Sequence, residues 1–170
     1  VLVVPIAYKP DTVTDSAPPV SDDKDAMLLR LVGSDLLFWL GLHAARDQVF
    51  RHVLATAPEQ IAAASTAERA RVNDMADRIL PVSARAAGLR DDTRLGKHLG
   101  PYPLERIRAP TLVFSARDDG FGTYAAAEYT ASRIPGATFI GFEHGGHLLV
   151  GRSDAVRTRL VELIVLPPKP

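Results

Sequence analysis

Short apolar runs bounded by turn residues occur at the start of the chain and twice in its last third. Residues 1–6 read VLVVPI, residues 111–116 follow Pro110, and residues 138–142 follow a Pro-Gly turn. Runs of this kind are typical of strands buried on both faces of a parallel sheet. The pattern therefore predicts three buried β-strands.

Helical periodicity follows the second and third of these runs. Thr123 can cap a helix over residues 124–134, which Pro135 and Gly136 then end. Ser153 or Asp154 can cap a last helix. Its predicted inward face comprises Val156, Leu160, Leu163 and Ile164. Strands that alternate with helices indicate an α/β fold with a parallel sheet and right-handed crossovers.

Residues 21–100 have helical spacing and no strand alternation. The first predicted helix covers residues 21–32, with Met27, Leu28, Leu31 and Val32 inward, and a second runs from Asp35 to about Val53. A third helix has Pro58 in its first turn, and a fourth covers residues 65–80 and is capped by Ser65 or Thr66. A short helix over 84–89 is stopped by Gly88, and loops are expected at 9–21 and 90–102. The expected domains are therefore residues 1–20 and 101–170, which carry the strands, and residues 21–100, which are helical.

Composition narrows the function classes. Lys+Arg and Asp+Glu both number 20, so the net charge is zero and no nucleic-acid partner is expected. The chain has no cysteine, which excludes disulfides, thiolate zinc sites and a cysteine nucleophile. The longest apolar run, residues 36–42, is too short to cross a bilayer, so we expect no membrane partner and a cytoplasmic location.

No pattern indicates a cofactor or a metal. His43, His52 and His98 are scattered, and neither a Gly-x-Gly-x-x-Gly sequence nor a P-loop is present. We therefore expect a small-molecule substrate and no cofactor. The oligomeric state is left open by the sequence.

Candidate chemistry follows the second and third strand runs. Asp118 and Asp119 come just after the run at 111–116, and His144 and His147 come just after the run at 138–142. The carboxyl ends of parallel strands meet at one edge of a sheet, and neighbouring strands lie about 4.8 Å apart. A carboxylate there can orient an imidazole, which is the orienting half of a nucleophilic triad.

These segments, taken in order, resemble the C-terminal half of the α/β-hydrolase fold. The matching stretches are residues 107–114 (IRAPTLVF), 116–119 (ARDD), 134–137 (IPGA) and 145–148 (GGHL). The resemblance implies that Asp119 is the triad acid, three residues after the small residue that closes the strand, and that His147 is the triad base. That small residue is Ala116 here, where the family usually has glycine. Asp118 is the alternative acid, and His144 could replace or assist His147.

The resemblance also implies roles for the other zones. The opening strand corresponds to the sixth strand of the family sheet, and residues 21–100 correspond to the helical cap that closes over the active site. Residues 36–42 should be helical in that cap, beside the active-site edge. The side chains of Phe38, Trp39 and Phe50 could line an apolar substrate pocket or pack the cap onto the core.

The nucleophile is the main departure from the family pattern. The family's Gly-x-Ser-x-Gly elbow follows the fifth strand, which would precede Val1, and this chain has none. Residues 151–155 (GRSDA) resemble an elbow, but Ser153 follows the histidine in the chain and is explained as a helix cap. We expect this chain to be the later part of a longer protein, with the missing N-terminal half of the hydrolase core as its partner, and to be inactive alone.

The expected function is hydrolysis of a small, rather apolar, ester-like substrate. A Ser-Asp-His triad whose serine lies outside this chain would carry the reaction. The alternative is a non-catalytic ligand-binding or interaction protein on the same scaffold.

Overall fold

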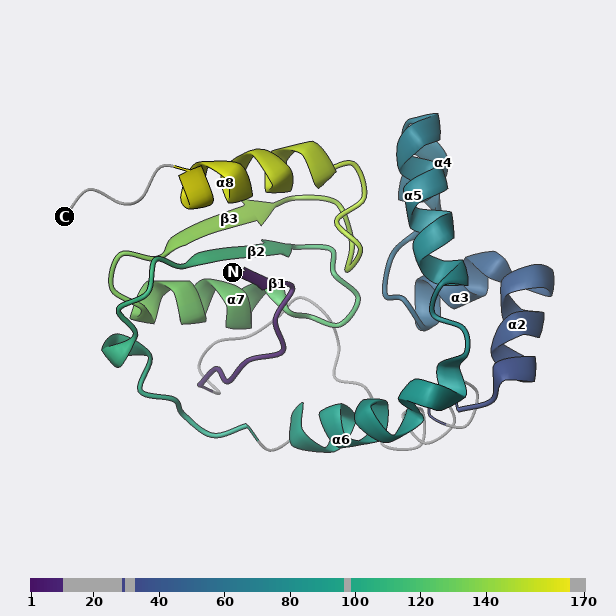
Figure 1. Ribbon diagram of the computed structural model, residues 1–170, viewed down its shortest axis with the longest axis horizontal. Helices are drawn as coiled ribbons and strands as arrows, with labels where there is room; N and C mark the ends of the chain where they lie inside the picture. Colours follow the sequence, from purple (N-terminus) through teal and green to yellow (C-terminus); the bar gives the residue numbers. More distant parts are fainter. Residues whose placement is uncertain (11–28, 30–32, 97–98, 166–170) are drawn as a thin grey trace. The chain divides into compact units, whose positions relative to one another are not determined.

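The computed structural model describes residues 1–10, 29, 33–96 and 99–165 (Figure 1). The chain divides into two compact units, Val1–Ala17 with Gly100–Pro170, and Pro18–Leu99. We call them the sheet unit and the helical unit. The divisions fall close to the domain limits expected at residues 20/21 and 100/101.

A parallel sheet of three strands forms the centre of the sheet unit, in the order β1-β2-β3. The strands are β1 (Leu2–Val3), β2 (Leu112–Ala116) and β3 (Thr138–Phe142). β2 is buried at every position because it pairs with both neighbours and has a helix on each face. The α/β class predicted from the sequence is therefore confirmed.

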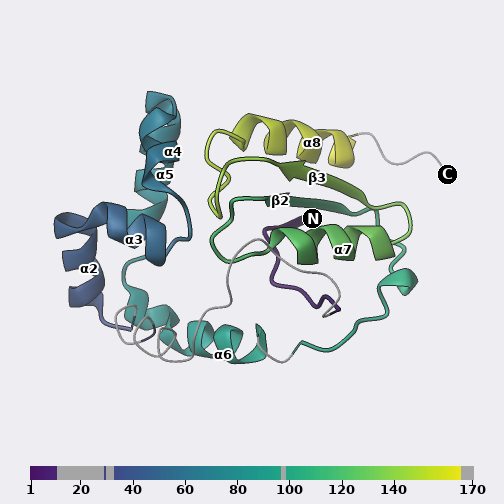
Figure 2. The same ribbon diagram turned by 180° about the vertical axis from the view of Figure 1, so that it is seen from behind.

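Helices α7 (Tyr124–Arg133) and α8 (Ser153–Val165) cover opposite faces of this sheet (Figures 1 and 2). Alternation along β2 divides the core between them. On one face, Leu112, Phe114 and Ala116 pack with Leu149, Val156 and Leu163, whereas on the other Val113 packs with Ala127 and Ala131. The predicted inward position of Ile164 on α8 is wrong, because Ile164 is 77% exposed, beside the stripe that Val156 and Leu163 present to the sheet.

The opening strand is shorter and more exposed than predicted. Only Leu2–Val3 is strand, and the Val3 side chain is 46% exposed. Val4 donates its N–H to the carbonyl of Phe114, but its φ of 42° already turns the chain away from the sheet. Pro5 follows and has no N–H to continue the ladder. The prediction of a buried strand over residues 1–6 is therefore corrected to a two-residue strand at the sheet edge.

The helical unit is built from short helices. They are α2 (Asp35–Ala44), α3 (Arg46–His52), α4 (Pro58–Ala63), α5 (Thr66–Asp77) and α6 (Ala86–Gly96), and the 3-10 turn η1 (Val82–Arg85) precedes α6. A second 3-10 turn, η2 (Leu104–Arg106), belongs to the sheet unit. Ser34 caps α2 by accepting from the N–H of Leu37, and Ser65 caps α5 by accepting from the N–H of Glu68. The prediction that residues 36–42 are helical is confirmed.

Two predictions in this unit are wrong. The single helix over 35–53 breaks at Ala45 (φ −146°, ψ 43°) into α2 and α3. Gly41 allows the break, because a side chain there would bring its Cβ to 3.0 Å from Val49 on α3.

The second error concerns residues 90–102. α6 continues through Gly88 to Gly96, so much of this stretch is helical rather than loop. An exposed glycine inside a helix costs only about 1 kcal/mol relative to alanine, which the following helix-forming residues and the Arg94–Asp91 pair can offset.

The predicted helix over 21–32, apart from Leu29, and most of the loop over 9–21 lie outside the described residues. In the part of the chain that the structure describes, no helix has both the length and the apolar character needed to cross a membrane.

Candidate active site

The carboxyl ends of β2 and β3 bring two loops together. Ala116 lies opposite Phe142 in the sheet register, and the N–H of Arg117 donates to the carbonyl of Phe142 at 2.9 Å. The side chain of Arg117 then donates to Glu143 at 3.0 Å. The loop after β2 and the loop after β3 therefore lie side by side, as the parallel arrangement requires.

Asp119 and His147 meet at this edge. His147 Nδ1 lies 3.0 Å from Asp119 Oδ2. The Asp119 side chain is fully buried, whereas that of His147 is 25% exposed. The predicted geometry, with Asp119 and not Asp118 facing His147, is thus what the structure contains, and the catalytic role of both residues stays a prediction.

Both oxygens of Asp119 have further donors. Oδ1 accepts from the N–H of Phe121 at 2.9 Å, and Oδ2 accepts from the hydroxyl of Thr123. Because the single hydroxyl hydrogen of Thr123 goes to Asp119, Ser115 must donate in the 3.0 Å contact between Ser115 Oγ and Thr123 Oγ1. A chain of buried donors thus ends on the carboxylate that holds His147.

Sequence reasoning missed this role of Thr123 and Ser115. Thr123 occupies the N-cap position of α7 as predicted, but its side chain makes no capping hydrogen bond and binds Asp119 instead. The signal for Ser115 was a lone hydroxyl in an otherwise apolar buried strand, since such a group needs a partner.

The imidazole of His147 is held on a second side by an aromatic ring. Phe121 contacts it edge to face, with centroids 4.7 Å apart and planes at 86°. An Nδ1–H that donates to Asp119 leaves Nε2 as the acceptor of the neutral ring. Among the residues that the structure describes, Nε2 has no hydrogen-bond partner. The ring is therefore arranged to take a proton at Nε2.

Asp118 makes a second set of contacts beside the first. Its Oδ1 accepts from the N–H of Gly146 at 2.8 Å, and its Oδ2 lies 3.4 Å from the N of Gly145 and 3.2 Å from Nδ1 of His144. The Asp118 side chain is 26% exposed, so these contacts leave it partly buried. The His144 side chain is 76% exposed.

The Gly145–Gly146 pair allows the bend that precedes His147. Gly146 has a φ of 58° and Gly145 a φ of 150°, which favour glycine. A side chain at Gly145 would also bring its Cβ to 3.2 Å from the Cα of Leu149. The backbone in front of His147 is therefore compact as well as bent.

The side chain of Arg117 also lies over the ring of Tyr124, the first residue of α7, with the guanidinium carbon 4.4 Å from the ring centroid. The hydrogen bond to Glu143 raises the pKa of Arg117, and burial raises the pKa of Tyr124. Gly141 accommodates the tyrosine, because a Cβ there would lie 2.9 Å from its ring. These contacts fasten α7 and both loops to the sheet.

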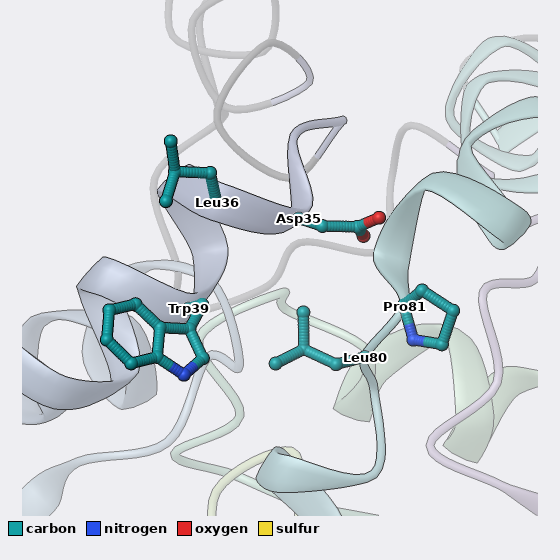
Figure 3. Close-up of a pocket in the computed structure, with 5 residues that line it drawn as sticks. All are labelled: Asp35, Leu36, Trp39, Leu80 and Pro81. Carbon is teal, nitrogen blue, oxygen red and sulfur yellow. The ribbon is translucent and has the colours of Figure 1, made fainter.

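An apolar pocket of about 490 Å³ lies in the helical unit (Figure 3). Its lining residues are Asp35, Leu36, Trp39, Leu80 and Pro81, which come from the start of α2 and from the residues before η1. The hydroxyl and the N–H of Ser83 bind the Asp35 carboxylate at 2.6 and 2.9 Å and hold its pKa below the usual value.

The aromatic residues of this unit differ in burial, and neither role left open by the sequence is tested by that difference. Phe38 and Phe50 are buried in the helical packing, whereas Trp39 lines the pocket and is 45% exposed. Trp39 also stacks on His43, with ring centroids 4.2 Å apart.

Ser153 is the first residue of α8, one position after the N-cap position predicted for it. In the described ranges no group of three or more His, Asp or Glu side chains is placed to hold a metal ion.

Comparison of this chain with protein-family models, with curated proteins and with solved structures finds no match.

Proposed function

We propose that this chain carries the acid and the base of a hydrolase of the α/β-hydrolase fold. The substrate is small, rather apolar and ester-like, and the triad is Ser-Asp-His with a serine outside these residues. His147 is the base and Asp119 is the residue that orients it.

The observation that carries the proposal is the hydrogen bond between the buried carboxylate of Asp119 and Nδ1 of His147 at the carboxyl ends of two adjacent parallel strands. A buried carboxylate is costly unless it is fully hydrogen-bonded, and Asp119 receives donors on both oxygens. Such an arrangement fixes the histidine tautomer and stabilises the imidazolium that forms in catalysis.

The proposed reaction uses the free nitrogen of the ring. Nε2 of His147 takes the proton of the serine hydroxyl as the serine oxygen attacks the ester carbonyl, and then returns that proton to the leaving alcohol. Water attacks the resulting acyl-enzyme by the same route, which releases the acid and restores the serine. Asp119 keeps the ring in place throughout.

The proposal assigns the helical unit to the cap of this fold. The support is its exposed apolar surface on α2, where Leu36 is 64% and Trp39 45% exposed, together with the apolar pocket that both residues line. Surface of this kind suits an apolar acyl group. That α2 lies beside the active-site edge stays a prediction.

A fluorophosphonate probe tests the proposal, because it reacts covalently with an activated serine. We would label the longest protein product that contains these residues, with the 170 residues alone as a second sample. The longer protein should be labelled, His147→Ala should abolish labelling, and the 170 residues alone should not react. His144→Ala is the matched control, since it removes an exposed histidine from the same loop.

Labelling that survives His147→Ala would contradict the proposal. Absence of labelling in the longer protein would do the same and would favour the non-catalytic binding protein on this scaffold.

A further inference from the structure

The loop that carries His147 is held by a carboxylate other than the one that holds its ring. Asp118 and Asp119 are consecutive at the end of β2, yet their side chains reach different parts of residues 144–147. Asp119 binds the imidazole of His147, whereas Asp118 binds the backbone just before it.

The contacts of Asp118 span three consecutive residues. Oδ1 accepts from the N–H of Gly146 at 2.8 Å, while Oδ2 accepts from the N–H of Gly145 at 3.4 Å and lies 3.2 Å from the ring of His144. Hydrogen bonds to a charged acceptor are the strong ones. The bond to Gly146 is the shortest of the three and is made to the residue next to His147.

This backbone needs a restraint from outside itself. Both glycines have positive φ values, and glycine loses more conformational freedom on folding than any other residue. On the other side of the loop, Arg152 donates to the carbonyl of His144 at 3.0 Å and the N–H of Val150 donates to the carbonyl of Gly145 at 2.8 Å. Those bonds occupy carbonyl groups, so Asp118 supplies the acceptor for the N–H groups.

We infer that Asp118 is a positioning residue for His147, which acts by fixing the Gly145–Gly146 backbone so that the imidazole meets Asp119. Its role does not include contact with substrate. The inference rests on the proposed function insofar as His147 is the base, but the geometry it concerns can be measured without catalysis.

NMR spectra of the histidine ring nitrogens, recorded on the 170-residue chain, test the inference together with amide hydrogen exchange. In the unmodified chain His147 should hold its proton on Nδ1, and the amide of Gly146 should be protected. In Asp118→Ala, exchange at Gly146 should become about tenfold faster or more, and the Nδ1–H form of His147 should lose population. Asp118→Asn keeps one oxygen that can accept from Gly146. Its exchange rate at Gly146 and its population of the Nδ1–H form should therefore lie between those of the unmodified chain and those of Asp118→Ala.

Three further variants distinguish the loss of the Asp118 contacts to the Gly145–Gly146 backbone from other causes of a change at His147. Glu143→Ala removes a carboxylate from the same loop that binds the side chain of Arg117, and it should change neither signal. His144→Ala removes only the ring contact of Asp118 and should also change neither. Asp119→Ala should remove the Nδ1–H preference of His147 while Gly146 stays protected.

The inference is overturned if Asp118→Ala speeds exchange at Gly146 and leaves the His147 tautomer unchanged, or if Glu143→Ala has the same effect as Asp118→Ala. Failure of Asp119→Ala to alter the tautomer would instead count against the Asp119–His147 pair and thus against the proposed function. Asp118→Asn provides the same comparison if Asp118→Ala does not fold.

Discussion

The sheet unit buries polar side chains close to one another, whereas the helical unit keeps most of its polar contacts at the surface. Ser115, Asp119 and Thr123 are buried in the sheet unit and bond to one another. Several ion pairs of the helical unit, such as Arg51–Glu59 and Arg78–Asp74, are exposed. Burying a polar group costs free energy unless the group is hydrogen-bonded. A buried cluster whose polar groups are all hydrogen-bonded therefore marks the place where an ionisable side chain must be held in one geometry.

The apolar side chains of β2 and α2 show the same contrast. β2 is fully buried, whereas the first turns of α2 leave Leu36, Leu37, Trp39 and Leu40 between 44% and 64% exposed. The sheet unit thus concentrates candidate chemistry, and the helical unit offers apolar surface. Variants in the two units should therefore differ in kind as well as in size.

The largest loss of stability should come from the core of the sheet unit. Phe114 is fully buried at the centre of β2, and Phe114→Ala should lower the free energy of unfolding by about 3–5 kcal/mol through lost burial and the cavity left behind. All 4 tyrosines lie in this unit, so near-UV circular dichroism of tyrosine during urea unfolding measures the effect. A loss below about 1 kcal/mol would mean that β2 is not the centre of the core.

A smaller loss should follow from the buried polar cluster. Thr123→Val removes the hydroxyl that donates to Asp119 and leaves Ser115 without its acceptor. It should cost about 1–3 kcal/mol in urea unfolding. Ser132→Ala is the matched control, because it removes an exposed hydroxyl from the same helix. A loss no larger than that of the control would contradict the cluster.

A pH-dependent effect should appear in the helical unit. Ser83 lowers the pKa of Asp35 below its usual value of 3.8, so the contribution of this contact is present above that value and is lost as the pH falls through the lower folded-state pKa. Ser83→Ala should therefore unfold more easily than the parent chain at about pH 6, and the difference should shrink as the pH falls below 3.8. Fluorescence of Trp39, the single tryptophan, reports on this unit. A difference that persists unchanged at low pH would contradict the account.

The smallest effect should come from the exposed ion pairs. Glu59→Gln breaks the pair with Arg51, whose side chains are 71% and 43% exposed. Solvent screening should leave the thermal midpoint within the error of the measurement, both with and without added salt. A clear loss that disappears in high salt would show that the surface pairs of this unit stabilise it more than we expect.

The positions of β2, β3, α7 and α8 could be predicted because each is specified locally. Residues 138–142 combine an apolar run with a preceding Pro-Gly turn, and the structure places β3 at those residues. The exposure of the first strand could not be predicted in this way. The exposure depends on how many strands pair with the first strand, which is a property of the whole sheet and not of the run VLVV.

The candidate site shows the same division. That a carboxylate after β2 would lie near a histidine after β3 followed from the positions of these residues at the ends of two parallel strands. The choice of Asp119 and His147 over Asp118 and His144 came from the resemblance to the α/β-hydrolase fold. The partners of Asp118 did not follow, because they depend on the path of a loop whose two glycines permit many conformations. In the helical unit, the break at Ala45 depends on the close approach of Val49 to Gly41, a contact between two helices that periodicity within one helix does not specify.

Asp119, and not its neighbour Asp118, should be the carboxylate on which the proposed activity of His147 depends. The most direct test is the kcat/KM for a p-nitrophenyl ester in the longest protein product that contains this chain. Asp119→Asn should lower it by about 10⁴-fold, because the histidine loses its orienting carboxylate. Asp118→Asn should lower it by about tenfold, and Asp154→Asn, an exposed carboxylate on α8, should leave it unchanged. Equal losses in Asp118→Asn and Asp119→Asn, or full activity in Asp119→Asn, would contradict the account.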